Sequence, residues 1–506
     1  MRSARLMAIL GSLNLFLSIP GPAWAQQKAP EPARPEQGHI LVLSLKESVV
    51  FGLKNNLDIT IEGFNLRIGE ANVTAARAIF DPTAFAEIVF RESTAQNRSL
   101  LAANRVLEND DLDTGAGIRQ KLPTGGNYEL RVDNNRNDTN TSFLQSLNPA
   151  YNTTFSLTLT QPLLRNFGVD VNRTQIKIAQ NNLEISKDRL RQRVMDVTTQ
   201  VQSAYWDLVF ALEDLEVQER SLRLARELEE LNRARVRAGV AAPVEITQAQ
   251  TEVKAREQDV IVAEKAVRDA EDQLKVVLNL PQEGNWGGAI LPSDTPAFTP
   301  VTVEVDTVVH EAFQKRPEYQ TAKIDIANRE LNLRFARNQL LPEFSLEGSI
   351  GATGLGPTFG ESTDRLTSGD FYNYSIGATL SMPIGNRAAR SDFLRARFEL
   401  EQAQASLRQV KLRITAEVRE AVRQVETAAK RVDTSGAAVV LAKEQLRIER
   451  KRLEAGVSTT FEVLRLQRDL AVAQANEVRA VTDHRKALAN LERASGTVLE
   501  RHQIEL

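Results

Sequence analysis

The 506-residue chain contains no cysteine, and this absence excludes several kinds of site. Without thiols there is no disulfide scaffold, no thiolate metal centre, no cysteine nucleophile and no lipid-carrying N-terminal cysteine. The four histidines are too far apart in sequence to suggest a metal-ligand cluster: His39, His310, His484 and His502. Aromatic residues make up only 6%, which is low for a compact enzyme core. The sequence therefore offers no metal set, no cofactor loop and no catalytic nucleophile.

A surplus of either charge and long apolar runs are also lacking. The formal net charge of −3 lacks the basic surplus expected of a nucleic-acid binder. Residues 1–25 combine early arginines, a short apolar run and Ala23-Trp24-Ala25, which predicts a signal peptide cut before Gln26. Residues 26–42 are expected to form a flexible leader. No later apolar run reaches about 18 residues, so the exported chain could enter a membrane only as a β-barrel.

The chain repeats itself. The segment Arg235-Val-Arg-Ala-Gly239-Val240 matches Arg452-Leu-Glu-Ala-Gly456-Val457 at an offset of 217 residues. Pro82 matches Pro342, and Pro162 matches Pro383, at offsets that imply about 39 extra residues in the first half. We therefore expect two structural repeats, 43–282 and 301–498, joined by a linker at 283–300 and followed by a tail at 499–506.

Both repeats show the same order of elements. A helix opens with a capping box at Ser44-x-x-Glu47, breaks at 55–58 and ends before Pro82. Alternating apolar and polar residues then predict strands at 128–133, 155–160, 344–347 and 374–381, with loops at 133–150 and 351–370. Gly351-Ala-Thr-Gly354-Leu-Gly356 lacks the order of a phosphate loop and is predicted to lie in the second of those loops.

Very long helices follow the strands. Residues 173–238 contain no proline or glycine, and apolar residues recur there at alternating spacings of three and four, as in a coiled coil. A second helix follows Pro243, and the pattern returns over about 390–454 and 461–495. Gly239 and Gly456 stand where each first helix must stop and turn. The sequence predicts two coiled-coil hairpins. Within them, Tyr205 and Trp206 are expected to pack between helices; the alternative is that they line an enclosed space.

A few strands per chain leave sheet edges unpaired, and assembly into a closed barrel removes them. At this point the chain resembles the TolC-type outer membrane efflux protein family. The resemblance covers nearly the whole mature chain. It rests on the duplicated Ala-Gly-Val turns, the Ala-Arg…Pro junctions at Pro82 and Pro342, and the strand-to-helix junctions at Pro162 and Pro383.

The resemblance implies a mainly α fold with a β-barrel portion, assembled as a homotrimer. Strands from three chains would form one outer-membrane barrel in lipid, and duplicated helical hairpins would form a periplasmic α-barrel. A periplasmic adaptor protein and an inner-membrane transporter, of the resistance–nodulation–division or ATP-driven class, would dock at the hairpin turns. The candidate turn residues are Arg235, Gly239, Val240, Arg452, Gly456 and Val457. The protein would be a passive conduit for efflux or type I secretion.

Acidic rings close the periplasmic entrance in this family, and Glu462 matches one acidic position while Arg465 replaces another. An arginine ring should weaken the preference for cations. The alternative is a solvated i, i+3 surface pair of no consequence for transport. The family expectation of four barrel strands per chain is open here, because the turn at 122–126 could add a hairpin to the barrel, fold into the lumen or lie outside.

Three other interpretations compete with the channel. A periplasmic adaptor needs only one helical hairpin, so the duplication and the amphipathic strands count against it. A purely structural coiled coil leaves the strands unexplained, and an enzyme has the least support. His484 lies at the seam position that matches Val267, where packing or a helix-end charge is expected. Phe371, Tyr372 and Tyr374 fit either an interfacial aromatic girdle or ordinary strand packing.

Overall fold

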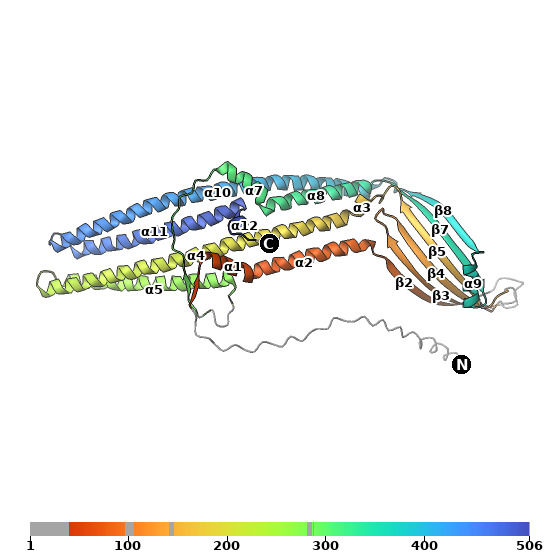
Figure 1. Cartoon of the computed structure of the whole chain (residues 1–506), viewed down its shortest axis with the longest axis horizontal. Helices are drawn as coiled ribbons and strands as arrows, with labels where there is room; N and C mark the ends of the chain where they lie inside the picture. Colours follow the sequence, from red (N-terminus) through yellow and green to blue (C-terminus); the bar gives the residue numbers. More distant parts are fainter. Residues whose placement is uncertain (1–39, 97–105, 141–145, 281–285, 287, 505–506) are drawn as a thin grey trace, which may run out of the picture.

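The computed structural model describes residues 40–96, 106–140, 146–280, 286 and 288–504. The predicted signal peptide and residues 26–39 of the predicted leader lie outside the described residues. The chain is elongated, with paired long helices at one end and a curved β-sheet at the other (Figure 1). None of the helices in the described part is long and apolar enough to cross a bilayer.

The first repeat contains β1 (Leu41–Leu43), α1 (Leu45–Asn55), α2 (Leu57–Arg77), a 3-10 turn (Ala78–Phe80), β2 (Thr83–Gln96), β3 (Val106–Lys121), β4 (Asn127–Thr139), β5 (Ala150–Pro162), α3 (Val169–Asn172), α4 (Thr174–Arg237) and α5 (Val244–Leu278). The remainder contains β6 (Ile290–Pro292), α7 (Val305–Lys315), α8 (Pro317–Asn338), β7 (Glu343–Gly356), α9 (Phe359–Ser368), β8 (Tyr372–Ser381), α10 (Arg387–Glu454), α11 (Thr460–Ser495) and α12 (Val498–Arg501).

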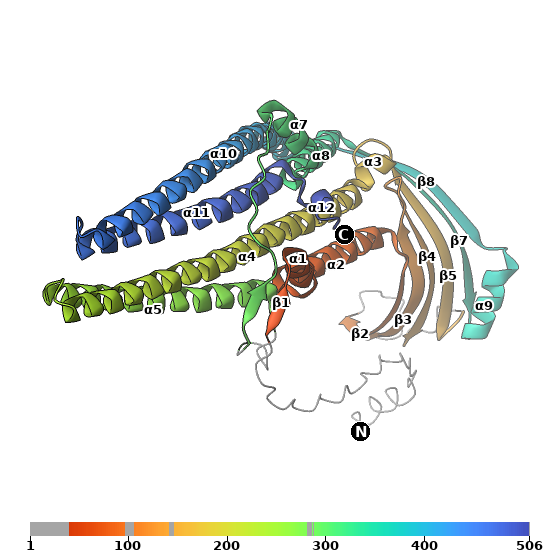
Figure 2. The same ribbon diagram turned by 60° about the vertical axis from the view of Figure 1, so that its left-hand side comes forward.

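The long helices form one curved layer (Figure 2). Near the sheet, α2 packs on α4, α4 on α8, and α8 on α10; towards the far end, α5 and α11 take the places of α2 and α8. The predicted long helices are confirmed, because α4 has 64 residues and α10 has 68. The predicted capping box is also present: the Ser44 hydroxyl accepts from the backbone amide of Glu47, and the Glu47 carboxylate accepts from the backbone amide of Ser44.

The shorter helices meet end to end along this layer. Asn56 separates α1 from α2, and its side chain donates to the carbonyl of Val277 near the end of α5 (3.0 Å). Asn279 donates in return to the carbonyl of Asn55 (2.9 Å). In the second repeat, a Cβ on Gly496, just after α11, would lie 3.0 Å from Lys315 at the end of α7. Both joints therefore lie beside α4 and α10, which run past them without a break.

The sheet has six strands in the order β2-β3-β4-β5-β7-β8, and every neighbouring pair is antiparallel. The predicted strands are confirmed, and the segment around the 122–126 turn joins the sheet as the β3–β4 hairpin. The sequence prediction missed β2. It was also wrong where it placed loops over 133–139 and 351–356, which belong to β4 and β7.

The predicted loop over 351–370 contains the helix α9. The side chain of Thr358 caps α9 by accepting from the backbone of Glu361 (3.3 Å). Ser362, buried on α9, hydrogen-bonds through its hydroxyl to Thr153 of β5 (2.7 Å). A Cβ on Gly354 would come within 1.9 Å of the Ser362 carbonyl oxygen. The glycines at the end of β7 therefore allow a helix to lie directly on the strands, and this contact is why the loop prediction failed.

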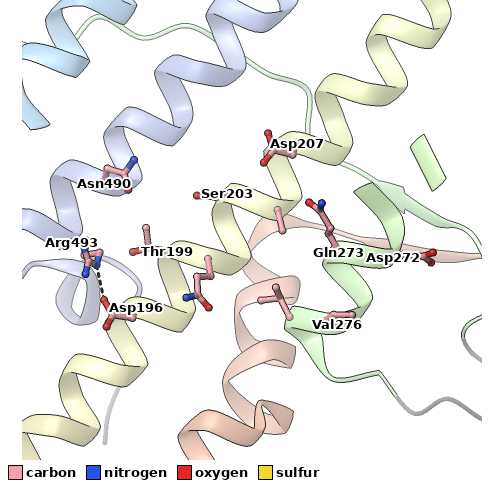
Figure 3. Close-up of a pocket in the computed structure, with 12 residues that line it drawn as sticks. Asp196, Thr199, Ser203, Asp207, Asp272, Gln273, Val276, Asn490 and Arg493 are labelled. Carbon is pink, nitrogen blue, oxygen red and sulfur yellow. Dashed lines mark hydrogen bonds and ion pairs between the residues drawn. The ribbon is translucent and has the colours of Figure 1, made fainter. Parts of the chain in front are cut away.

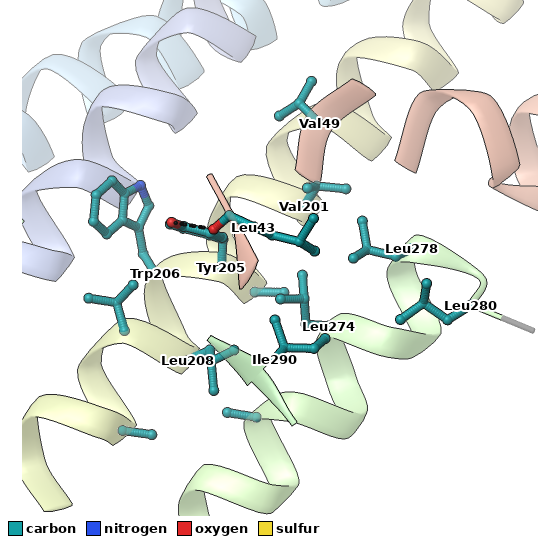
Figure 4. Packing of buried hydrophobic residues seen from close by; sticks show 14 of the residues in the cluster. Leu43, Val49, Val201, Tyr205, Trp206, Leu208, Leu274, Leu278, Leu280 and Ile290 are labelled. Carbon is teal, nitrogen blue, oxygen red and sulfur yellow. Dashed lines mark hydrogen bonds between the residues drawn. The ribbon is translucent and has the colours of Figure 1, made fainter. Parts of the chain in front are cut away.

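The largest hydrophobic cluster lies halfway along the helices, where β1 and β6 pair in parallel (Figure 4). Tyr205 and Trp206 are both buried there, so the packing prediction for this pair is confirmed. The Tyr205 hydroxyl donates to Asp294 Oδ2 (2.8 Å), which also accepts from the backbone of Leu45 (2.6 Å). The start of the first repeat and the linker between the repeats are thereby fastened to α4.

Candidate functional site

The two predicted turns have the same backbone geometry. Gly239 and Gly456 have φ values of +75° and +76°, in the left-handed region that glycine adopts at least cost. The amide of Val240 donates to the carbonyl of Arg235 (3.0 Å), as the amide of Val457 does to that of Arg452 (3.0 Å). These are the bonds of a Schellman cap. All six predicted turn residues therefore belong to two matching helix ends, and both valines are exposed.

The predicted pair of Glu462 and Arg465 lies on the first turns of α11. Their side chains form an ion pair (2.6 Å) in which the arginine is more than half exposed. The backbone amide of Glu462 donates to the side chain of Thr459, which caps the helix (3.5 Å). The pairing expected from the i, i+3 spacing is present, and whether it faces a pore stays a prediction.

A set of contacts that sequence reasoning missed joins the two hairpins close to their turns. The hydroxyl of buried Thr460 bridges Asn232 Oδ1 (3.1 Å) and Glu245 Oε2 (2.7 Å) on the first hairpin. Two turns further along α11, Arg468 bonds to Glu252 (2.8 Å). Glu252 also holds Arg256 (2.5 Å). We call these links across the hairpins, Thr460–Glu245, Thr460–Asn232 and Arg468–Glu252, the inter-hairpin latch.

A cavity of about 400 Å³ lies between the hairpins beside this latch. Its walls include Leu228, Leu231 and Leu453 and the guanidinium of Arg235. The Nη1 atom of Arg235 is buried and has no hydrogen-bond partner among the described residues. A buried guanidinium nitrogen without an acceptor is costly, and this atom is shielded from solvent in the groove as well.

A second groove, of about 800 Å³, opens halfway along the helices between α4, α5 and α11 (Figure 3). Arg493 pairs with Asp196 (2.6 Å) at one end, and Lys486 pairs with Asp207 (2.6 Å) near the other. The described residues contain no cluster of His, Asp and Glu that could hold a metal ion. Both of these basic side chains are therefore neutralised by carboxylates of α4.

His484 packs inside the helical layer, as expected for a seam residue. It is 1% exposed, and its ring meets that of Phe298 edge-on, with centroids 5.0 Å apart. Neither ring nitrogen has a hydrogen-bond partner among the described residues. Burial, with a smaller contribution from the neighbouring Arg485, lowers the pKa of His484 below 6.5. The ring is therefore neutral and hydrophobic in the folded protein near pH 7.

The sheet has one apolar and one polar face, because successive side chains point to opposite sides. Large apolar side chains are exposed on the same face of all six strands. They include Ile88, Phe90, Ile118, Val132, Leu157, Leu159, Leu346, Ile350, Tyr374, Ile376 and Leu380. Phe371, Tyr372 and Tyr374 are exposed at the β8 edge rather than buried in packing.

Comparison with known proteins agrees with this architecture. The profile of the outer membrane efflux protein family matches residues 52–280 and 308–497. The pyoverdine export outer membrane protein OpmQ of Pseudomonas putida is 25% identical over 413 residues, covering 80% of this chain and 81% of that protein. Nodulation protein T of Rhizobium leguminosarum bv. trifolii is 25% identical over 303 residues, and the match spans 58% of this chain and 62% of that protein.

The fold has a counterpart among solved structures. The outer membrane channel CmeC of Campylobacter jejuni superimposes with a TM-score of 0.66 at 15% identity, covering 90% of this chain and 85% of that one. The family profile covers most of the chain, on both sides of the linker between the repeats. The chain belongs to the outer membrane efflux protein family and is an outer-membrane exit duct for efflux, with its long helices extending into the periplasm.

Proposed function

We propose that three copies of this chain close around one axis into a single duct. The observation that carries this proposal is that both lateral borders of the chain are open. The outer edges of β2 and β8 pair with no strand in the described part of the chain. Below them, α2 exposes an apolar stripe on a face that α4 does not cover, and α10 exposes large apolar side chains as well. The stripes contain Leu57, Ile61, Phe64 and Ile68 on α2, and Leu394, Phe398 and Leu412 on α10.

Open strand edges and exposed apolar stripes are both unfavourable in a lone chain. A ring of identical copies removes both at once, because the β8 edge of one copy meets the β2 edge of the next. The α10 stripe then covers the α2 stripe of the neighbouring copy. The apolar face of the sheet would meet outer-membrane lipid, and the exposed aromatic residues of β8 would lie at its boundary.

The hairpin turns are the proposed docking site for a periplasmic adaptor. Val240 and Val457 expose apolar side chains at the two turns, and leucines, among them Leu231, line the groove between the hairpins. An adaptor helix with apolar side chains at its tip would cover the two exposed valines. An inner-membrane transporter, proton-driven or ATP-driven, would supply energy and most of the cargo specificity, because a passive duct has neither.

The trimer is tested with a charge placed on the α2 stripe. Ile61→Lys should abolish the heat-sensitive oligomer in outer-membrane fractions, because the lysine would be buried between copies. Glu70→Lys is the control, since Glu70 is exposed on the same helix but off the stripe. Normal oligomer yield from Ile61→Lys would remove the stripe from the interface, and a soluble periplasmic wild-type protein would refute the duct itself.

Glu462 and Arg465 are proposed to ring the closed entrance. Arg465→Asp would replace three positive charges with three negative ones in the trimer, and the ion selectivity of the duct in a planar bilayer should shift towards cations. Arg447→Asp, on the exposed surface of α10, serves as the control for a change in overall charge. Equal selectivity of the two variants would show that Arg465 does not face the pore.

A further inference from the structure

The β3–β4 hairpin has no counterpart in the second repeat. Four of the six strands continue into a long helix of the layer: β2 follows α2, β5 leads to α4, β7 follows α8, and β8 leads to α10. In contrast, β3 and β4 are joined to one another by the turn at 122–126, at the end of the sheet nearest the helices. The hairpin therefore adds two strands to the sheet without adding a helix below them.

This hairpin is built into the sheet along its whole length. β3 has 16 residues and β4 has 13, more than the roughly 9–11 residues that a strand needs to cross a bilayer. Gln120 donates to the carbonyl of Phe80, in the 3-10 turn that follows α2 (2.7 Å), and the amide of Gly168, just before α3, donates to the carbonyl of Thr124 (2.9 Å). The turn is thus fixed between the 3-10 turn after α2 and the segment just before α3.

The apolar surface of the sheet also continues through the hairpin. Ile118 of β3 and Leu130 of β4 stand opposite each other, and Leu130 stands opposite Leu157 of β5. Tyr374 of β8 and Ala84 of β2 lie in the same row across the sheet. From this row the apolar stretch runs mainly towards the helices on β8 (372–380) and away from them on β2 (84–90), so its position shifts from strand to strand. Strands that cross a horizontal lipid layer at a tilt require such a shift, and β3 and β4 follow it.

We propose that the hairpin is part of the outer-membrane wall, so that three copies of the six-stranded sheet close an eighteen-stranded barrel. This inference rests on the proposed trimer. With strands about 4.8 Å apart and tilted by about 40°, eighteen strands give a backbone diameter of about 36 Å, whereas the twelve left without the hairpin give about 24 Å. Twelve helices about 9 Å apart enclose about 34 Å. The hairpin therefore keeps the duct at one width from periplasm to exterior.

The hairpin also concentrates charge on the inner wall. On the polar face, β5, β7 and β8 carry mostly hydroxyl, amide and glycine positions, with Glu343, Glu347 and Leu355 as exceptions. The polar face of β2, β3 and β4 instead carries Glu87, Arg91, Asp111, Asp113, Arg119, Glu129, Arg131 and Asp133. Arg131 bridges Asp133 (2.6 Å) and Glu87 (3.4 Å). The resulting lumen suits bulky, hydrated cargo that passes a strip of mixed charge.

Cysteine scanning tests the placement directly, because the chain has no cysteine of its own. In outer-membrane trimers, Arg131→Cys should react with a charged, membrane-impermeant thiol reagent, whereas Leu130→Cys should react only with a lipid-soluble maleimide. The matched controls are Ser156→Cys and Leu157→Cys, which occupy the same rows on β5. If β5 alternates in this way and β4 does not, the hairpin lies outside the wall. If β5 also fails to alternate, the proposed duct is wrong.

A deletion measures the width. Removing residues 106–139 leaves β2 free to pair with β5. When about 10 Å of side chains is subtracted from each backbone diameter, the free opening is about 26 Å in the complete barrel and about 14 Å in the deletion variant. The largest polymer that enters from the sheet side should fall accordingly, with an about threefold loss of cross-section. An unchanged polymer cut-off in a trimeric deletion variant would refute the eighteen-stranded barrel. If the deletion variant does not assemble, the cysteine pattern decides the question.

Discussion

Replacing Arg468 with alanine should loosen the inter-hairpin latch and favour the open form of the periplasmic entrance. The Arg468 side chain is 56% exposed, whereas that of its partner Glu252 is 12% exposed. Exposed pairs contribute roughly 0.2–1 kcal/mol, and breaking a buried pair costs roughly 3–5 kcal/mol. Glu252 keeps Arg256 as a partner, so we expect the loss of stabilising free energy to lie just above the range for exposed pairs, at about 1–1.5 kcal/mol. That corresponds to about a tenfold change in the ratio of open to closed hairpins.

Planar-bilayer recording provides the assay, and Arg447 provides a matched control. The Arg447 side chain is also 56% exposed, but it pairs with Glu444 on its own helix. Arg468→Ala should raise the time spent in the high-conductance state about tenfold, whereas Arg447→Ala should leave it unchanged. Equal conductance of the two single variants would refute the role assigned to the latch.

Two further predictions concern a turn and a buried histidine. Gly456→Val should lower the free energy of unfolding of the hairpin by about 1–2 kcal/mol, and Gly456→Asn should lower it by less. The cost comes from the positive φ, because a Cβ at this position would meet nothing within 4 Å. Equal melting temperatures of the two variants would contradict this backbone argument. The lowered pKa of His484 means that the unfolded chain takes up the proton first, so stability present above about pH 6.5 should decline as the pH falls. The fall in melting temperature between pH 7.5 and pH 5.5 should be smaller in His484→Leu, and an identical fall would show that other groups cause it.

The helices were predictable because their signals are local. Heptad spacing, the absence of proline and the terminal glycines place α4 and α10 within a few residues of their observed bounds. The strand β2 was missed because Phe85 and Val89 put apolar residues on the polar face as well, which obscures the alternation. The pairing of β1 with β6 joins two three-residue segments that are far apart in the chain, and no local pattern marks it.

The candidate site divides in the same way. Gly239 and Gly456 could be found because a helix end needs a particular residue at a particular place. The latch could not, because Thr460 meets Glu245 across 215 residues, and the contact depends on how two hairpins pack side by side. The position of the β3–β4 hairpin was likewise open in the sequence, because alternation predicts a strand but not its neighbours.

The joints between the end of α5 and the α1–α2 corner, and between the end of α11 and the α7–α8 corner, have a mechanical consequence. A tube whose helices all ended at one level would bend most easily at that level. Here α4 and α10 act as splints across each joint, and α4 alone spans about 96 Å at 1.5 Å per residue. The wall therefore resists bending halfway along its length. A twist that an adaptor imposes on the hairpin turns would be transmitted along α4 and α10 to the sheet, because these two helices are continuous.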